Sequence, residues 1–369
     1  MSVSVESKTT FEIAVLPGDG IGYEVMPICT RLIAKAAAAA GVTLTFDEIE
    51  AGAALYRRTG EAFPEQARAR CREVDAILLG AMGLPSVRYA DGTEIAPQLD
   101  LRDDLTLSCG VRPVRTIPGG PAVLSDPRND KIDFVLIRES TEGFFAARKN
   151  GRIEHDQTAY DTGVVTRDTS EKLFEFAFSL AQKRRNEGFP GRVTCVDKAN
   201  VFSSMAFFRK IFHEIADRHP DIQADAAYVD ATALNLVKRP WDFDVLVTEN
   251  LFGDILSDLG AALIGGLGFA PSADIGQNHA VFQPCHGSAP DIAGQGVANP
   301  TAMILSGAMM LDWLGHRHDL PDLEAVARLM SDSVDAVYET KRVKPADLGG
   351  QDGTQAIGDA IEQELGKRI

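Results

Sequence analysis

The stretch FDVLVTENLFGDILSDL, residues 243–259, joins two patterns that together indicate the fold class. Residues 243–250 are a short apolar run typical of a buried strand, and the segment from Asn250 onward has the spacing of an amphipathic helix. On that helix Asp254 and Asp258 lie four residues apart, and therefore on one face. Like charges so placed repel, and a divalent cation would offset the repulsion. The spacing alone leaves both a metal site and a solvated acidic face open.

The same alternation recurs along the 369 residues. Apolar runs typical of strands begin at residue 11 and occupy 75–83, 134–139, 193–197 and 226–230, and helical patterns occupy 170–188, 203–219 and 322–340. This order predicts an α/β protein with parallel and mixed sheets flanked by helices. Because ligands gather at the carboxyl ends of strands, charged strand ends predict a site assembled from many segments; these are Arg138, Asp197, Asp230 and Glu249.

A glycine turn, LPGDGIG at residues 16–22, follows the first strand. Its spacing, Gly18-x-Gly20-x-Gly22, differs from the G-x-G-x-x-G of dinucleotide-binding sites, and Asp47 matches the expected ribose-binding acid only loosely. We therefore predict a tight turn beside a ligand and not a standard Rossmann fold.

Bulk composition excludes several function classes. A net charge of −16 argues against a sequence-independent nucleic-acid surface, which needs a basic face. No apolar run is long enough to span a membrane, and the polar segment before Phe11 predicts no signal peptide. The five cysteines are scattered without a C-x-x-C pair, which favours a reducing, cytoplasmic location; they are Cys29, Cys71, Cys109, Cys195 and Cys285.

Five motifs in register carry a resemblance that covers nearly the whole chain. They are LPGDGIG (16–22), VDKANV (196–201), NLFGDILSDLGAALIGGLGFAPSADIG (250–276), QPCHGSAPDIAG (283–294) and VANP (297–300). Together they resemble the metal-dependent β-decarboxylating dehydrogenases of the isocitrate/isopropylmalate dehydrogenase family, and the 3-isopropylmalate dehydrogenases most. The family also contains homoisocitrate and tartrate/D-malate dehydrogenases.

The resemblance implies a metal site and a base shared between two subunits. Asp254 and Asp258 would bind Mg²⁺ or Mn²⁺, joined by Asp230 of a second copy. Lys198, also supplied by that copy, would take the proton of the substrate hydroxyl. A homodimer is therefore implied, with no nucleic-acid or membrane partner.

The resemblance also assigns binding residues. Arg102, Arg112 and Arg138 would hold the carboxylates of a small 2-hydroxy diacid, because guanidinium groups pair bidentately with carboxylates. Gln98 and Leu99 would face the substituent at C3 of the substrate. The cofactor would be NAD, because a carboxylate at Asp291 accepts hydrogen bonds from ribose hydroxyls and repels a 2′-phosphate. The implied cofactor contacts are His286, Gly287, Ser288, Ala289, Asp291, Ile292, Asn299 and Asn200.

Three positions depart from the family pattern. Phe145 stands where the family has the tyrosine that protonates the enol product, so another donor such as Tyr160 or water, slow protonation by solvent, or oxidation without efficient decarboxylation all remain open. Gln283 replaces the usual glutamate. Gln98 replaces a leucine that would face an isopropyl group, and a buried amide there suits a more polar substituent.

The implied architecture has two domains. The first joins residues 1–107 and 265–369 and would bind the cofactor; the second, residues 108–264, would carry substrate and dimer contacts, with an arm at about 143–165. The implied function is NAD- and Mg/Mn-dependent oxidation, with decarboxylation, of a 3-substituted malate. The alternatives are a tartrate/D-malate dehydrogenase and a non-catalytic homologue that binds NAD or an organic acid.

Overall fold

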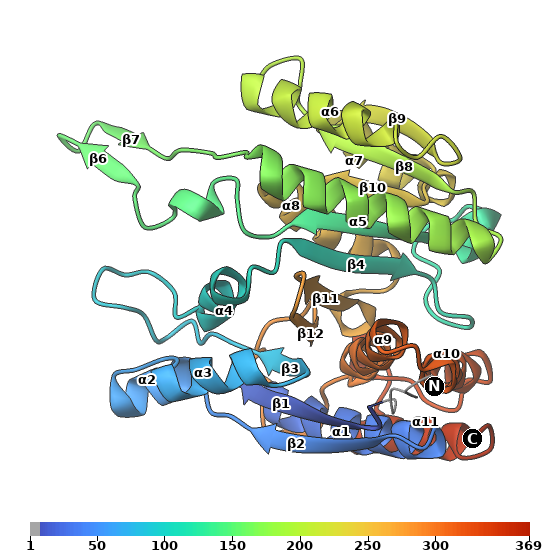
Figure 1. Ribbon diagram of the computed structural model, residues 1–369. Coiled ribbons are helices and arrows are strands. Elements are labelled where there is room, and N and C mark those ends of the chain that lie inside the picture. Colours follow the sequence, from blue (N-terminus) through green and yellow to red (C-terminus); the bar gives the residue numbers. More distant parts are fainter. Residues whose placement is uncertain (1–7) are drawn as a thin grey trace, which may run out of the picture.

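The computed structural model describes residues 8–369, so the first seven residues of the predicted 1–107 segment lie outside the described residues. The chain forms an α/β fold in which helices flank one large sheet, as predicted (Figure 1). Among the described residues, no helix combines the length and apolar character needed to cross a membrane.

A ten-stranded sheet runs through the molecule in the order β2-β1-β3-β12-β11-β4-β5-β10-β8-β9, and β6 and β7 form a separate hairpin. The strands are β1 (Thr10–Gly18), β2 (Thr43–Glu48), β3 (Ala76–Ala81), β4 (Cys109–Arg115), β5 (Asp133–Glu139), β6 (Arg152–Glu154), β7 (Thr158–Tyr160), β8 (Arg192–Asp197), β9 (Gln223–Tyr228), β10 (Val245–Thr248), β11 (Pro271–Ile275) and β12 (Ala280–Pro284). Pairing is parallel except where β11 meets β12 and β4, and where β4 meets β5. The sheet is therefore mixed at its centre.

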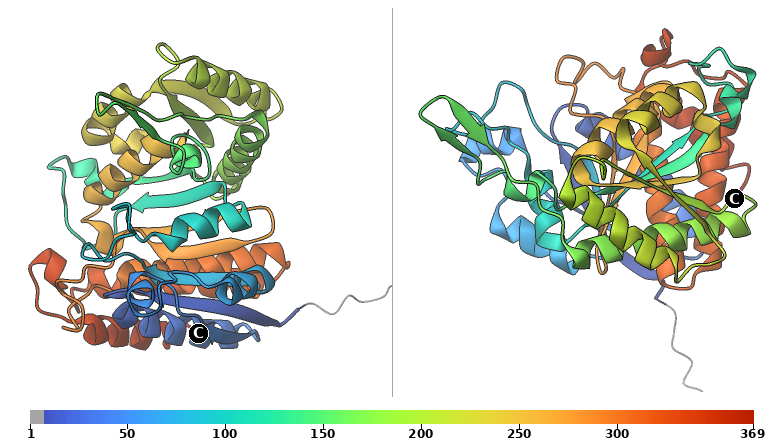
Figure 2. Two further views of the ribbon diagram at one scale, coloured as in Figure 1. Left: turned by 90° about the vertical axis from the view of Figure 1, so that its left-hand side faces the viewer. Right: turned by 90° about the horizontal axis from the view of Figure 1, so that it is seen from above.

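Helices cover both faces of this sheet (Figures 1 and 2). They are α1 (Gly22–Ala39), α2 (Ala53–Thr59), α3 (Glu65–Glu73), α4 (Pro97–Leu105), α5 (Arg167–Asn186), α6 (Ser203–Ala216), α7 (Val229–Lys238), α8 (Asn250–Leu263), α9 (Thr301–Arg317), α10 (Pro321–Glu339) and α11 (Thr354–Leu365). Apolar side chains recur on the inward face of each long helix and fill one large core, with two smaller apolar clusters beside it. In α5 and α6 this spacing packs the phenylalanine rings at positions 174, 178, 208 and 212 against one another.

The predicted strand at 226–230 is partly wrong. β9 ends at Tyr228, and Asp230 lies in the first turn of α7. The run 243–250 likewise contains a shorter strand, because Glu249 accepts hydrogen bonds from the amides of Leu251 and Phe252 and so caps α8. The sequence patterns did not predict β4, β11 and β12, which hold the centre of the sheet.

The predicted domain boundary falls between β11 and β4. The five strands on the β11 side come from residues 1–107 and 265–369, and the five on the β4 side come from 108–264. Because the two groups share one continuous sheet, the division into domains stays a prediction. The expected arm is present as a hairpin within 143–165, and it extends away from the body of the molecule (Figure 1).

Candidate active site

Three neighbouring strands, β11, β4 and β5, assemble the charged cluster. Asp274 is in register with Gly110, and Gly110 is in register with Arg138. A Cβ atom at Gly110 would lie 2.5 Å from Oγ of Ser140 and 3.1 Å from Oδ1 of Asp274, so only glycine leaves room for both. Side chains alternate along a strand, so Arg112 projects on the same face as position 110. The register therefore gathers Asp274, Arg112 and Arg138 on one face of the sheet.

Asp274 joins two of the three predicted substrate arginines. Its Oδ2 accepts a hydrogen bond from Nε of Arg102 on α4, and its Oδ1 accepts one from a terminal nitrogen of Arg112, each at 3.0 Å. The Gln283 amide donates to Oδ2 at 2.6 Å. Burial raises the pKa of Asp274, but the charges of Arg102 and Arg112 outweigh it and hold that pKa well below its usual range. Asp274 is therefore a buried, ionised counter-ion of the arginines.

Arg138 joins the cluster from the end of β5. Its Nε and one terminal nitrogen donate to Oδ1 of Asn250 at 2.9 and 2.8 Å, and it forms an ion pair with Asp254. The ring of Phe145 lies 5.2 Å from its guanidinium carbon. Burial and the like charge of Arg102 lower the pKa of Arg138 to about 10, so it is charged at neutral pH. Three cations in one buried place suit a multiply charged anion.

Asp254 and Asp258 lie on the outer face of α8, as their spacing predicted. Both are exposed, and partial desolvation and the charge of Asp254 raise the pKa of Asp258. A divalent cation beside the pair would remove that repulsion, so the donor set fits Mg²⁺ or Mn²⁺. Within residues 8–369, no three acidic, histidine or cysteine side chains of one chain converge on a common point.

Lys198 and Asp230 form a second, separate cluster. Nζ of Lys198 lies 2.8 Å from Oδ1 of Asp230, whose side chain is 68% exposed, and this hydrogen bond lowers the pKa of Asp230. No hydrogen bond or ion pair between described residues joins this pair to the arginines. The structure thus brings together the two residues expected from a second copy, apart from those expected from the first. Asn200, next to them, is exposed.

A hydrogen bond joins the glycine turn, residues 16–22, to the predicted cofactor loop that begins at His286. The amide of Ile21 donates to the carbonyl of Ser288 at 2.9 Å, and the hydroxyl of Ser288 donates to the carbonyl of Gly83. Gly20 has φ +58°, and a Cβ atom there would lie 2.0 Å from that Ser288 carbonyl. The turn therefore needs glycine for close approach to residues 286–289, and not for a standard dinucleotide fingerprint.

Asp19, within this turn, has a structural role that the sequence did not indicate. Its buried carboxylate accepts hydrogen bonds from the amides of Ala53, Ala54 and Gly83 at 2.8–2.9 Å. It thereby caps α2 and holds the loop that binds Ser288.

The predicted cofactor contacts differ in whether their hydrogen-bonding atoms are available to a ligand. Nδ1 of His286 lies 3.0 Å from the carbonyl of Gly287, and its buried Nε2 has no partner among the described residues. Burial lowers the pKa of His286, so Nε2 is a free acceptor that fits the amino group of adenine. Asp291 is exposed, and its carboxylate has no hydrogen-bond or ion-pair partner within residues 8–369. Asn299 is instead used internally, because its side chain bonds Thr301 and Asp347.

The remaining loop residues lie around these contacts. Gly287 is exposed, Ile292 is half-buried, and Ala289 has a positive φ of 38°. They form part of the surface that would meet the cofactor.

Gln98 and Leu99 lie on α4, near Arg102. The Gln98 side-chain oxygen is buried without a hydrogen-bond partner among the described residues, and Leu99 is half-buried. An unpaired buried amide oxygen is costly unless a ligand donates to it.

Two of the charged strand ends have structural roles. Asp197 is fully buried and accepts two hydrogen bonds from Arg209 at 2.7 Å, and Glu249 caps α8. Arg138 does lie at the end of β5, and its role toward a ligand stays a prediction. The strand-end pattern overstated the number of residues whose side chains are available to a ligand.

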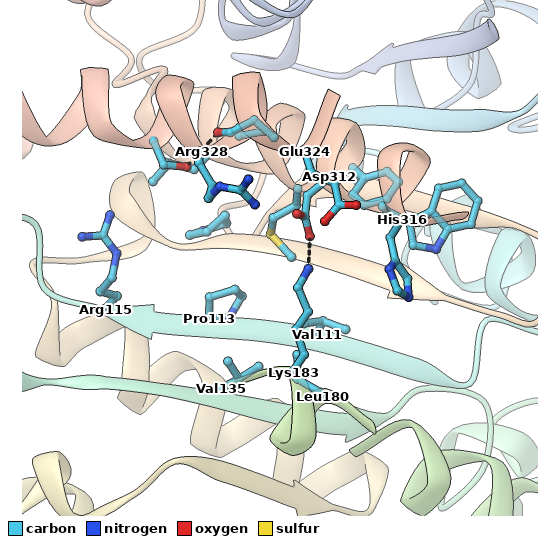
Figure 3. A pocket seen from close by; sticks show the side chains of 18 of the residues that line it. Val111, Pro113, Arg115, Val135, Leu180, Lys183, Asp312, His316, Glu324 and Arg328 are labelled. Atoms are coloured by element: carbon cyan, nitrogen blue, oxygen red, sulfur yellow. Dashed lines mark hydrogen bonds and ion pairs between the residues drawn. The ribbon is translucent and has the colours of Figure 1, made fainter. Parts of the chain in front are cut away.

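A cavity of about 1190 Å³ lies on the other face of the same strands (Figure 3). Val111 and Pro113 of β4 and Val135 of β5 form part of its floor, and α5, α9 and α10 form its walls. Lys183 and Asp312 form a 2.9 Å ion pair across it. None of the predicted site residues lines it, so its size does not make it the active site.

Comparisons with known proteins agree with the sequence motifs. The family profile described as isocitrate/isopropylmalate dehydrogenase matches residues 12–361. The 3-isopropylmalate/3-methylmalate dehydrogenase of Methanocaldococcus jannaschii is 39% identical over 97% of this chain and 98% of its own length. The homoisocitrate dehydrogenase of the same organism is 40% identical over 97% and 99%.

The structural comparison gives the same result. A crystal structure of isocitrate dehydrogenase from Methylococcus capsulatus has a TM-score of 0.83 at 36% identity, covering 96% of this chain and 99% of that one. A β-decarboxylating dehydrogenase from Thermococcus kodakarensis has a TM-score of 0.78 at 33% identity, with 97% and 96% covered. The chain therefore belongs to the isocitrate/isopropylmalate dehydrogenase family and is an enzyme of the dehydrogenase class.

Proposed function

We propose that the protein oxidises a 3-substituted malate, a 2-hydroxy diacid, with NAD⁺ and Mg²⁺ or Mn²⁺, and decarboxylates the product as a 3-isopropylmalate dehydrogenase does. One observation carries the proposal: Arg102, Arg112 and Arg138 converge beside Asp254 in one buried cluster. Relatives named for isopropylmalate and homoisocitrate support the substrate class.

The arginines bind and orient the diacid. Arg102 and Arg112 each use part of their donor set on Asp274, which leaves nitrogens free for carboxylate oxygens. Arg138 is held by Asn250, so its guanidinium plane is fixed before the substrate arrives.

The cofactors fit residues that have unused acceptors. Asp254, Asp258 and Asp230 of the partner subunit would hold the metal, and His286 and Asp291 would hold the adenosine end of NAD⁺. When bound, NAD⁺ accepts hydride and the metal polarises the C2 oxygen as a Lewis acid. The free carboxylate of Asp291 favours NAD⁺ over NADP⁺, because it repels a 2′-phosphate.

Lys198 of a second copy acts as the base that accepts the hydroxyl proton. The surface around this lysine supports the dimer, because large apolar side chains are exposed there and on α7 and α8, namely Val201, Phe202, Leu234, Val237 and Ile255. Association of two copies through α7 and α8 would bury these side chains.

Phe145 lies against Arg138 but has no proton to donate. The enol formed by decarboxylation therefore takes its proton from another donor or from solvent. Tyr160 lies on the exposed hairpin, where its ring is stacked on Arg152. The cytoplasmic location stays part of the proposal, and the five free cysteines suit a reducing compartment.

Of the alternative tartrate or D-malate oxidation, a specific observation favours tartrate. The unpaired Gln98 oxygen would accept a hydrogen bond from a C3 hydroxyl, which tartrate has and 3-isopropylmalate lacks. Gln98→Leu should then lower kcat/KM for tartrate relative to 3-isopropylmalate by about tenfold or more, because an unpaired hydroxyl would face leucine. An unchanged ratio would leave 3-isopropylmalate as the only candidate of the two.

The test of the function is a screen of 2-hydroxy acids with NAD⁺ and Mn²⁺, read out for both NADH and CO₂. The panel contains 3-isopropylmalate, D-malate, tartrate, isocitrate and homoisocitrate. At least one should give NADH, and EDTA or Asp254→Asn should remove the activity. If no acid yields NADH with Mn²⁺, or with Mg²⁺ in a repeat of the screen, the proposal fails.

A further inference from the structure

Asp274 is the buried residue of the cluster to which the sequence assigned no function. It lies on β11, its side chain is 1% exposed, and among the described residues it is the one carboxylate that forms ion pairs with both Arg102 and Arg112. Ser140 also approaches Oδ1, at 3.4 Å, so both oxygens are occupied by donors. An ion so buried is costly unless it is fully paired, and here the pairing is complete.

Neighbouring residues accommodate the Asp274 carboxylate by leaving space for it and by donating a hydrogen bond. Gly110, in register on β4, leaves the space that it fills. Gln283, from β12, supplies a neutral donor 2.6 Å from Oδ2. A glutamate at 283 would instead place a second carboxylate against Asp274, and the two would repel. The neutral amide of Gln283 is therefore compatible with a charged Asp274, whereas a carboxylate at position 283 is not.

The charges of the cluster set which anion it can hold. Arg138 also pairs with Asp254, but the charges of Asp254, Asp258 and Asp230 of the partner subunit would be balanced by the proposed divalent metal together with Lys198. The three guanidinium groups and the internal carboxylate of Asp274 then leave two positive charges for the substrate. Two carboxylates match that charge, whereas a third carboxylate would be buried without a counter-ion.

We infer that Asp274 is a specificity-determining residue, which selects substrates with two carboxylates and an uncharged C3 substituent against tricarboxylates such as isocitrate and homoisocitrate. The inference rests on the proposed function, since it assumes that the three arginines bind substrate carboxylates. Asp274 itself touches no substrate; it acts by neutralising the arginines that do.

The wild-type enzyme provides the first test, which does not depend on any variant folding. Its kcat/KM should be higher for 3-isopropylmalate, D-malate or tartrate than for isocitrate or homoisocitrate. A preference for either tricarboxylate would overturn the inference while leaving the dehydrogenase function standing. No turnover of any acid would instead overturn the proposed function.

The second test is Asp274→Asn, which removes the charge and keeps the shape. The ratio of kcat/KM for tricarboxylates to that for dicarboxylates should rise by about tenfold or more, because a third carboxylate then meets an unneutralised guanidinium group. In Asp274→Asn/Gln283→Glu the negative charge returns beside the arginines, and the ratio should fall back toward that of the wild type. An unchanged ratio in a folded Asp274→Asn enzyme would overturn the inference.

Asp244→Asn is the matched control. Asp244 is also buried and paired with an arginine, since it accepts a 2.6 Å hydrogen bond from Arg184. It is bonded to neither Arg102 nor Arg112. This variant should lose stability without changing the substrate ratio, which separates a structural effect from selection by charge. An equal change of ratio in Asp244→Asn would count against a role specific to Asp274.

Discussion

The adjacent strands β11, β4 and β5, here called the seam, present two faces that differ in charge although they are made of the same strands. On one face Arg112, Arg138 and Asp274 form a buried charged cluster in which each group has a partner. On the other face Val111, Pro113 and Val135 form an apolar floor, and partly exposed ion pairs line the cavity (Figure 3). Alternation of side chains along each strand produces this division.

The difference shows on which face the loss of a charged partner costs stability. The cavity-lining pairs Lys183–Asp312 and Arg115–Asp335 have side chains 22–38% exposed, so water compensates either partner when the other is lost. In the cluster, loss of one partner leaves a buried charge unmatched. We therefore expect the chemistry on the charged face and small mutational effects on the other.

Arg112→Met should have the largest effect, because it leaves Asp274 with fewer donors in a buried place. We expect a loss of about 3–5 kcal/mol in the free energy of unfolding. Arg115→Met makes the same change on the same strand but on the opposite face, and it should cost about 1 kcal/mol or less. Urea denaturation of both variants measures the difference, and equal losses would contradict the contrast between the faces.

Glu139 provides a pH-dependent test, because it is a buried carboxylate that follows Arg138 on β5 and has no cationic partner among the described residues. Among the described residues, it accepts hydrogen bonds from Thr141 and from the amide of Glu142 alone, and burial raises its pKa from 4.5 to about 7. The folded state thus binds a proton that the unfolded state has released between about pH 4.5 and 7, so stability should fall as pH rises through this window.

Glu139→Gln should remove that fall. Wild type and variant are compared by denaturation at pH 5 and pH 8, and the stability of the wild type relative to the variant should be lower at pH 8. A difference that does not change with pH would show that Glu139 has no raised pKa.

Lys183→Met should have the smallest effect. Its partner Asp312 is 38% exposed, so the variant should lose roughly 0.5 kcal/mol of stability at most. Because no predicted site residue lines the cavity, kcat/KM should stay within about twofold of the wild type. A larger fall in kcat/KM would mean that the cavity side of the seam is coupled to catalysis.

The sequence predicted the placement of charged residues where a local pattern, such as helical spacing or a strand end, determines it. Asp254 and Asp258 share a helix face because their spacing is four, and Arg138 lies at a strand end beside them. Asp274 escaped prediction because PSADI is a five-residue strand with one charge, and nothing in the local pattern shows that Arg102, Arg112 and Gln283 come from other segments to bind it. The pairing of distant strands creates that contact.

Other differences have equally local causes. Asp197 ends β8 as expected, whereas Glu249 follows the end of β10 and caps α8. Arg209 already occupies the oxygens of Asp197, and backbone amides occupy those of Glu249. An unused acceptor such as Nε2 of His286 can be found only once packing is known. A motif thus predicts which residue is present, whereas the fold determines whether its hydrogen-bonding atoms are free.

The central claim is that the charged cluster of one chain is completed by Lys198 and Asp230 of a second. Lys198→Ala and Asp254→Ala homodimers should each be inactive, and Lys198→Ala should still bind NAD⁺. After subunit exchange, half of the dimers are mixed and each has one intact site, so about one quarter of the wild-type activity should return. No activity from verified mixed dimers would contradict the shared site.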